Sequence, residues 1–211
     1  MKKLLLALGV FAVLLASPTT AAEKEPASLE ALVQLAGQAE QDGDLAALDK
    51  RVGQVLAHPR FEALEPRLRY AFHITSARLA IDQRDLPRAY RPLRLATASE
   101  HADYEAWRLR AAVENDLEWR DAALASLLTL FKRWPEEVVA WDDRFLSQAI
   151  FTADSDSQAR HALLLALFEA DYSRPTGTPD DLWMELALAH VARGEDEAAR
   201  KVLARLGDPS Y

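Results

Sequence analysis

The chain has 211 residues, half of them apolar, and it contains no cysteine. Its 25 basic and 33 acidic residues give a formal net charge of −8, which argues against nonspecific binding to nucleic acid. The lack of cysteine excludes a disulfide framework, and the chain is long enough to bury an apolar core without one.

The first 22 residues have the layout of a secretory signal peptide. Lys2 and Lys3 precede an apolar run over residues 4–16, Pro18 follows as a helix breaker, and small residues lead up to Ala22. As a helix the run spans roughly 20 Å, short of the ~30 Å hydrocarbon core of a bilayer. We therefore expect cleavage after Ala22 and export to the periplasm; the alternative is an uncleaved signal anchor. Losing the two lysines makes the net charge −10.

From residue 28 onward almost every segment predicts a helix. Ala and Leu are abundant, runs of β-branched residues are absent, and most glycines and prolines fall between periodic stretches. The first helical segment begins after Ser28, a favourable N-cap, and the segment DGDLAALDKRVGQVL follows a turn that contains glycine. The two segments together predict a helical hairpin.

This hairpin recurs along the chain. Large, small, small and large apolar residues have identical spacing in two places: Trp107, Ala111, Ala123 and Leu127, and Trp183, Ala187, Ala199 and Leu203. A looser copy is Leu32, Ala36, Leu48 and Val52. Two more copies require a turn longer by two or three residues: Tyr70, Ile74, Ala89 and Leu93, and Trp141, Phe145, Ala159 and Leu163. The pattern predicts an all-α protein of about five hairpins, over residues 28–60, 66–100, 104–136, 138–170 and 180–211.

The skeleton resembles the tetratricopeptide repeat, a helix-turn-helix unit whose helices touch through small residues. In the last copy Trp183 corresponds to the first-helix anchor, His190 to the usual aromatic residue and Gly194 to the turn glycine. The resemblance covers residues 28–211 and implies an α-solenoid whose first helices line a concave groove. On this alignment the candidate partner-binding residues are Phe72, Arg78, Arg108, Asn115, Asp142 and Met184, with Thr75, Ala112 and Leu146 beside them.

No motif for catalysis or metal binding is found in the sequence. The five histidines are scattered over different hairpins, with neither H-E-x-x-H nor two histidines at metal-binding spacing. The stretch DSDS at residues 154–157 lacks the glycine and the closing Glu of a calcium loop, and it predicts a polar turn that caps a helix. We expect no metal, no cofactor and no enzymatic activity, although a triad assembled from distant hairpins would leave no sequence motif.

Charge is distributed unevenly along the chain. Residues 60–94 contain eight arginines against four acidic residues, and residues 136–211 contain fifteen acidic against seven basic residues. Arg88, Arg91 and Arg94 recur at intervals of three and predict a basic ridge along one helix. The plainest interpretation of such runs is a solvated face. The alternative is a bipolar surface that orients one partner, or an anion-binding site at the arginine end.

These patterns favour a non-catalytic adaptor of the cell envelope that binds a protein or peptide partner in the concave groove. One alternative is a binder of an anionic envelope glycan or lipid headgroup that uses the arginine ridge. Another is a structural subunit of an outer-membrane or secretion assembly. No nucleic-acid partner and no transmembrane segment in the mature chain are expected.

Overall fold

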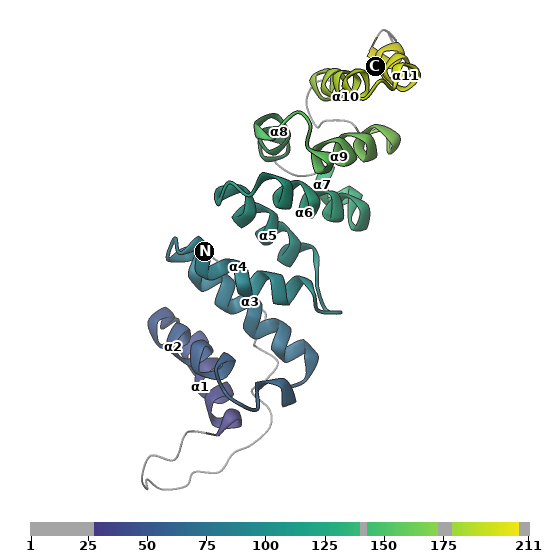
Figure 1. The fold of residues 1–211 in the computed structure, drawn as a ribbon. Helices are drawn as coiled ribbons and strands as arrows, with labels where there is room; N and C mark the ends of the chain where they lie inside the picture. The colour runs from purple at the N-terminus through teal and green to yellow at the C-terminus, as the bar shows by residue number, and fades with distance from the viewer. Residues whose placement is uncertain (1–27, 140–142, 173–178, 207–211) are drawn as a thin grey trace, which may run out of the picture. The chain divides into compact units, whose positions relative to one another are not determined.

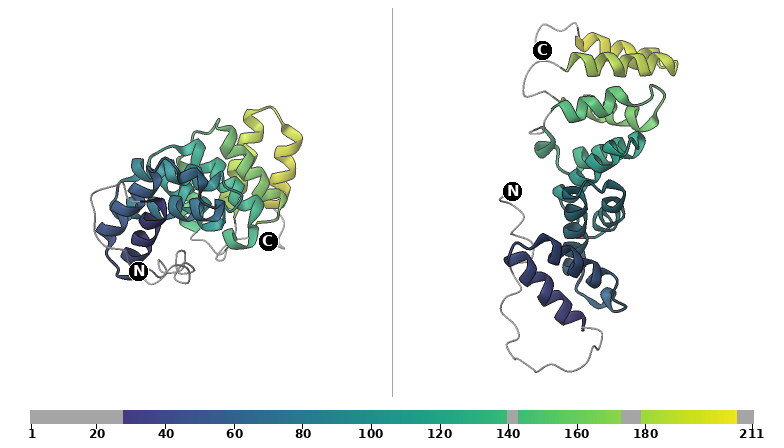
Figure 2. Two further views of the ribbon diagram at one scale, coloured as in Figure 1. Left: turned by 90° about the horizontal axis from the view of Figure 1, so that it is seen from below. Right: turned by 90° about the vertical axis from the view of Figure 1, so that its left-hand side faces the viewer.

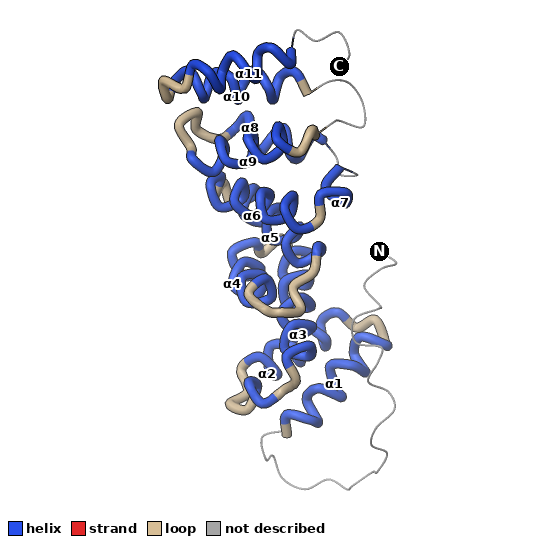
Figure 3. The backbone as a smooth tube through the Cα atoms, turned by 90° about the vertical axis from the view of Figure 1, so that its right-hand side faces the viewer, coloured by secondary structure: helices blue, strands red, loops and turns tan. Residues whose placement is uncertain are grey.

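The computed structural model describes residues 28–139, 143–172 and 179–206. Within those ranges every regular element is helical, which confirms the expected all-α class (Figures 1 and 3). The predicted signal peptide lies outside them, as do Trp141 and Asp142. The chain forms two compact units, an N-terminal unit that ends at Ala102 and a C-terminal unit that begins at Asp103.

The N-terminal unit contains two helical hairpins. Helices α1 (Leu29–Gln41) and α2 (Leu45–Leu56) form the first, and α3 (Pro66–Asp82) and α4 (Leu86–Thr97) form the second (Figure 1). A short 3-10 helix, η2 (Phe61–Ala63), connects them, and α2 also packs against α3. Helices α1, α2 and α4 begin after residues whose side chains accept a hydrogen bond from the first helical turn: Ser28, Asp44 and Asp85.

The C-terminal unit also contains two hairpins, but they are separated by a different arrangement. Helices α5 (Tyr104–Asp116) and α6 (Arg120–Arg133) form one hairpin, and α10 (Asp180–Ala192) and α11 (Asp196–Leu206) form the other (Figure 2). The intervening helices are α7 (Pro135–Val139), α8 (Asp143–Thr152) and α9 (Gln158–Glu169). Helix α9 packs mainly against α6 and α10, while α8 lies against α6, so the expected fourth copy is not a close hairpin.

Four interhelical turns have the same backbone structure. Each has one residue with positive φ, between 60° and 73°: Gly43, Arg84, Glu118 and Gly194. In each turn the N–H of the next residue donates to the carbonyl five residues earlier, with N···O distances of 2.9–3.0 Å: Asp44 to Ala39, Asp85 to Ala80, Trp119 to Glu114, and Glu195 to His190. This hydrogen bond closes the first helix as in a Schellman motif, and the donor residue starts the second helix directly.

The shared turn corrects the expected register of the second hairpin. The sequence pattern placed Ile74 at the small-residue position and required a longer turn, but the turn after α3 is the same length as the others. Ala77 stands seven residues before the positive-φ residue, where the other three hairpins also have a buried alanine: Ala36, Ala111 and Ala187. The small-residue contact therefore recurs in all four hairpins, because only a small side chain lets the helix backbones approach closely.

Most of the expected core positions are buried, with one clear exception. Leu203 on α11 is exposed, although the repeat pattern placed it among the contacts of the second helix. Helix α11 packs mainly against α10, and this side chain stays at the surface. No helix in the described part of the chain is both long enough and apolar enough to span a bilayer.

Candidate binding surfaces

The groove positions expected on α3 are largely occupied by internal packing. Phe72 is fully buried in the cluster formed with α1 and α2, and Thr75 is also buried, so neither side chain is available to a partner. Arg78 is half-buried. It lies near Glu40, whose pKa is raised by burial and pulled back by this guanidinium. The register correction explains Phe72, since shifting the alignment by three residues turns it from the groove to the core.

The corresponding positions on α5 are also engaged. Arg108 donates two hydrogen bonds to Glu105, at 2.7 and 2.8 Å, and this pairing raises the pKa of the guanidinium. Asn115 is buried, and its backbone carbonyl accepts the N–H of Glu118 in the turn. Ala112, also on α5, is partly buried, and Leu146 on α8 is buried. Asp142 lies outside the described residues.

Helix α10 carries an exposed apolar row, which we define as Met184, Leu188 and Val191. Their exposed fractions are 45%, 56% and 55%. Spacings of four and three residues place the three side chains on one face of the helix. The opposite face is buried in the core through Leu182, Trp183, Leu186 and Ala187. Sequence reasoning identified Met184 alone; the missed signal is that α10 is apolar around most of its circumference, so its core face cannot accommodate every apolar residue.

The predicted arginine ridge on α4 is interrupted at its first member. The guanidinium of Arg88 forms an ion pair with Asp49 on α2 and donates a 2.8 Å hydrogen bond to Gln83. Arg91 and Arg94 are exposed, and neither enters an ion pair with the described residues. The ridge therefore offers two exposed cations, while Arg88 fastens α4 to the first hairpin.

Three side chains distant in sequence meet where α9, α10 and α11 pack together. His161 lies on α9, His190 lies in the last turn of α10, and Glu195 immediately precedes α11. The two imidazole rings stand nearly perpendicular, at 87° with centroids 4.9 Å apart, and Nδ1 of His190 lies 2.5 Å from Oε2 of Glu195. One possible ligand atom from each residue lies within 4.8 Å of the other two. We call these three residues the His161 cluster.

The protonation equilibria of the cluster follow from its surroundings. Burial lowers the pKa of His161, and the charges of Arg193 and His190 act in the same direction. The hydrogen bond with His190 lowers the pKa of Glu195, whose carboxylate is exposed to solvent. No sequence motif announces this cluster, because His161 and His190 are brought together only by the packing of α9 on α10.

No protein-family model, curated protein or solved structure matches the chain.

Proposed function

We propose that the chain is an exported, non-catalytic adaptor of the cell envelope, built as a tetratricopeptide-like α-solenoid that binds a protein partner. The observation that carries the proposal is the exposed apolar row of α10. The same helix already buries its other face in the core, so about half of each side chain in the row is left over for contact with a partner. Apolar side chains gathered on one exposed face of a soluble domain mark an interaction surface more often than isolated ones do.

The free energy gained by burying the row is too small to hold a partner by itself. Burying the exposed remainder of each of its three side chains is worth about 1 kcal/mol, or roughly 3 kcal/mol for the row. A complex with a micromolar Kd requires about 8 kcal/mol, so polar and charged contacts must supply the rest. The binding surface therefore extends beyond the row.

The charge around the row favours a partner that carries basic residues. Asp180 and Asp181 stand exposed at the start of α10, and Asp196 and Glu197 stand exposed at the start of α11. Residues 136–211 carry a net charge of −8. We therefore propose that the partner presents an amphipathic helix or peptide with apolar residues flanked by Lys or Arg, since complementary charge speeds and orients docking.

The test begins by finding the partner from the row itself. A photo-crosslinking residue is placed at position 188 in the exported protein, and the captured protein is identified and purified. We expect crosslinking from position 188 and little from position 203. Leu203 is a matched control, since it is comparably exposed, at 43%, but lies on α11, outside the row. Crosslinks that form equally from both positions would argue against the row.

The affinity of the purified partner then distinguishes the surfaces. Leu188→Asp should weaken binding by about tenfold or more, since it replaces an apolar anchor with a charge, while Leu203→Asp should not. Loss of binding in Arg108→Ala instead would support the groove, and loss in Arg91→Ala combined with Arg94→Ala would support the anionic-ligand alternative. In either case the row is not the site.

A further inference from the structure

We propose that His161, His190 and Glu195 form a binding site for a divalent transition-metal ion, with Zn²⁺ as the ion of first choice. The ion would join α9 to the α10–α11 hairpin through His161 of α9, His190 of α10 and Glu195 in the turn before α11. This site is independent of the partner-binding row, because Met184, Leu188 and Val191 contribute no ligand to it.

The donor set matches the preferences of zinc. Two imidazoles and one carboxylate are a common set of three protein ligands at zinc sites, with a fourth position left to water. Bonds of about 2.0–2.1 Å place tetrahedral ligand atoms about 3.4 Å apart. Nδ1 of His190 lies 2.5 Å from Oε2 of Glu195, and one possible ligand atom from each of the three residues lies within 4.8 Å of the other two. Shifts of about 1 Å in side-chain position therefore suffice to enclose the ion.

A second observation points to a ligand at this place. Nδ1 of His161 is buried and has no hydrogen-bond partner. Buried imidazole nitrogens are ordinarily satisfied by a donor, an acceptor or a metal. The ring of His161 instead faces the ring of His190, which is itself buried and is oriented by Glu195. A metal ion bound by both imidazoles would give His161 the polar partner that it lacks.

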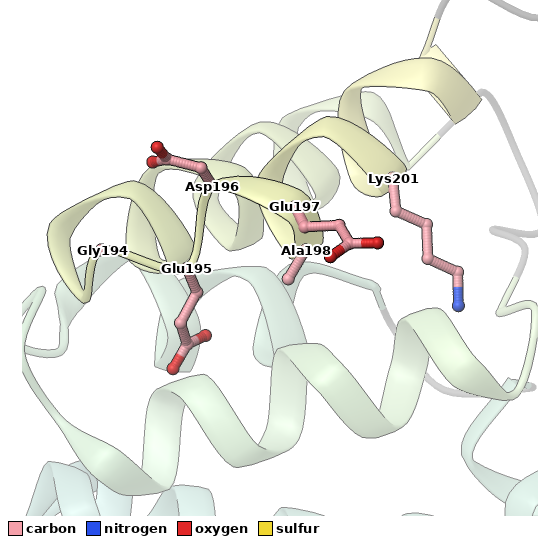
Figure 4. Close-up of a pocket in the computed structure, with 6 residues that line it drawn as sticks. All are labelled: Gly194, Glu195, Asp196, Glu197, Ala198 and Lys201. Carbon is pink, nitrogen blue, oxygen red and sulfur yellow. The ribbon is translucent and has the colours of Figure 1, made fainter.

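Charges of both signs surround the cluster. Glu195, Asp196 and Glu197 line an open depression together with Lys201 (Figure 4). Figure 4 shows the side chains of Glu195, Asp196 and Glu197 pointing in different directions, with Asp196 directed away from Glu195. The guanidinium of Arg193 acts electrostatically on both His161 and Glu195 and opposes a cation there. The exposed carboxylate of Glu195 leaves the ion a route from solvent.

The experiment titrates Zn²⁺ into the chelator-treated mature chain by calorimetry at pH 7.5. We expect one ion per chain with a Kd of about 10 µM or lower. An ion concentration of about 100 times the Kd should raise the Tm by roughly 5–10 °C, through preferential binding to the folded state. Co²⁺ should give the visible absorption of a four-coordinate complex, which reports the geometry without reference to any activity.

Variants distinguish ligands from neighbours. Glu195→Gln retains a hydrogen-bond acceptor for His190 but removes the carboxylate, and it should weaken Zn²⁺ binding by at least about tenfold, as should His161→Gln. The matched control is Glu197→Gln, which removes the same charge from the same depression and should change the Kd by less than about threefold. Arg193→Gln should tighten binding, because it removes an opposing charge.

Circular dichroism establishes that each variant is folded before its affinity is compared. The proposal is overturned if the wild-type chain binds no Zn²⁺ at about 100 µM, ten times the expected Kd. It is also overturned if the wild-type, His161→Gln and Glu195→Gln proteins bind equally. Binding that depends on Glu197 and not on His161 would assign the ion to the acidic surface and reject the cluster.

Discussion

Among the described residues of the C-terminal unit, Trp183 is the largest side chain that is fully buried. Its indole meets the ring of Phe168 edge-on, with centroids 5.3 Å apart, and the guanidinium of Arg205 lies 5.5 Å from its centroid. Arg205 also donates a 3.0 Å hydrogen bond to the carbonyl of Phe168. One side chain thus connects α10 to α9 and α11, which is why the position tolerates no small residue without loss of packing.

Trp183→Ala should lower the free energy of unfolding by about 3–5 kcal/mol, the usual cost of emptying a large buried aromatic site. Urea denaturation monitored by circular dichroism measures the change. Trp119→Ala is the control, because Trp119 is exposed and its removal should cost less than about 1 kcal/mol. Equal midpoints for wild type and Trp183→Ala would contradict the burial of this side chain.

His73 couples stability to pH in the N-terminal unit. Its ring meets Phe61 edge-on at 5.3 Å, and its Nδ1 is buried without a hydrogen-bond partner. Burial lowers the pKa of this imidazole from its ordinary value of 6.5, the charges of Arg69 and Arg91 act in the same direction, and Glu62 opposes them. The ring of His73 therefore stays neutral in the folded state at pH values at which it is already protonated in the unfolded chain.

The sign of the pH effect follows from this difference. Above pH 6.5 both states are neutral at His73 and its contribution to stability is complete; as the pH falls below 6.5, the unfolded state binds the proton first and stability declines. His73→Gln should therefore lose less unfolding free energy than wild type between pH 7.5 and pH 5.5. His161 has a shift of the same sign and still contributes in the variant. Parallel curves for the two proteins would contradict the assignment.

At the scale of elements, the four shared turns place different residues in one backbone conformation. Gly43 and Gly194 adopt a positive φ at no steric cost, whereas Arg84 and Glu118 adopt it with a side chain present. A left-handed conformation costs a non-glycine residue about 1–2 kcal/mol. The closing hydrogen bonds and the packing of the two helices hold Arg84 and Glu118 in place despite this cost.

Glu118→Gly should therefore raise the free energy of unfolding by about 0.5–1 kcal/mol, because relief of the strained φ exceeds the added flexibility of the unfolded chain. Glu118→Ala, which keeps the strain, is the matched control and should not stabilise.

Gly194→Ala should lower stability by about 1 kcal/mol. A Cβ at Gly194 would meet no atom within 4 Å, so the loss would come from the backbone alone. Chemical denaturation of the wild-type and Gly194→Ala proteins measures the effect. An unchanged free energy of unfolding in Gly194→Ala would show that φ at this position relaxes freely.

At the scale of the whole molecule, the chain divides into two compact helical units and carries a predicted leader that lies outside the described residues. The charge is uneven as well, with net +4 over residues 60–94 and net −8 over residues 136–211. We propose that the exported protein binds a basic amphipathic partner outside the cytoplasm through its acidic C-terminal half.

Export makes a direct prediction about the mature N-terminus. Expressed with its own leader in a bacterial host, the protein recovered from the periplasmic fraction should begin at Glu23. Ala22→Arg should block this processing and leave the longer chain in the membrane fraction, because the residue before the cleavage site must be small. Mass spectrometry of the intact protein measures both. An unprocessed wild-type chain would support the signal-anchor alternative.

Local periodicity was sufficient for the helical class and for most of the contacts within hairpins. Apolar residues spaced by three and four predict a helix whatever surrounds it, and the alanines at Ala36, Ala111 and Ala187 mark where two helices of one hairpin cross. These features involve residues close together in the chain, so their spacing alone carries the information. Glycine also marked two of the turns, at Gly43 and, through the family resemblance, at Gly194.

Only the tertiary structure decided the register of the second hairpin and the accessibility of the candidate site. The sequence pattern placed the small-residue contact of the second hairpin at Ile74; the hydrogen bonds that close the turn at Arg84 moved this contact to Ala77 and Phe72 into the core. Whether an apolar side chain is covered depends on which helix packs against it, which left Leu188 exposed on α10. His161 and His190 meet for the same reason, since the packing of α9 on α10 brings together residues that no local spacing relates.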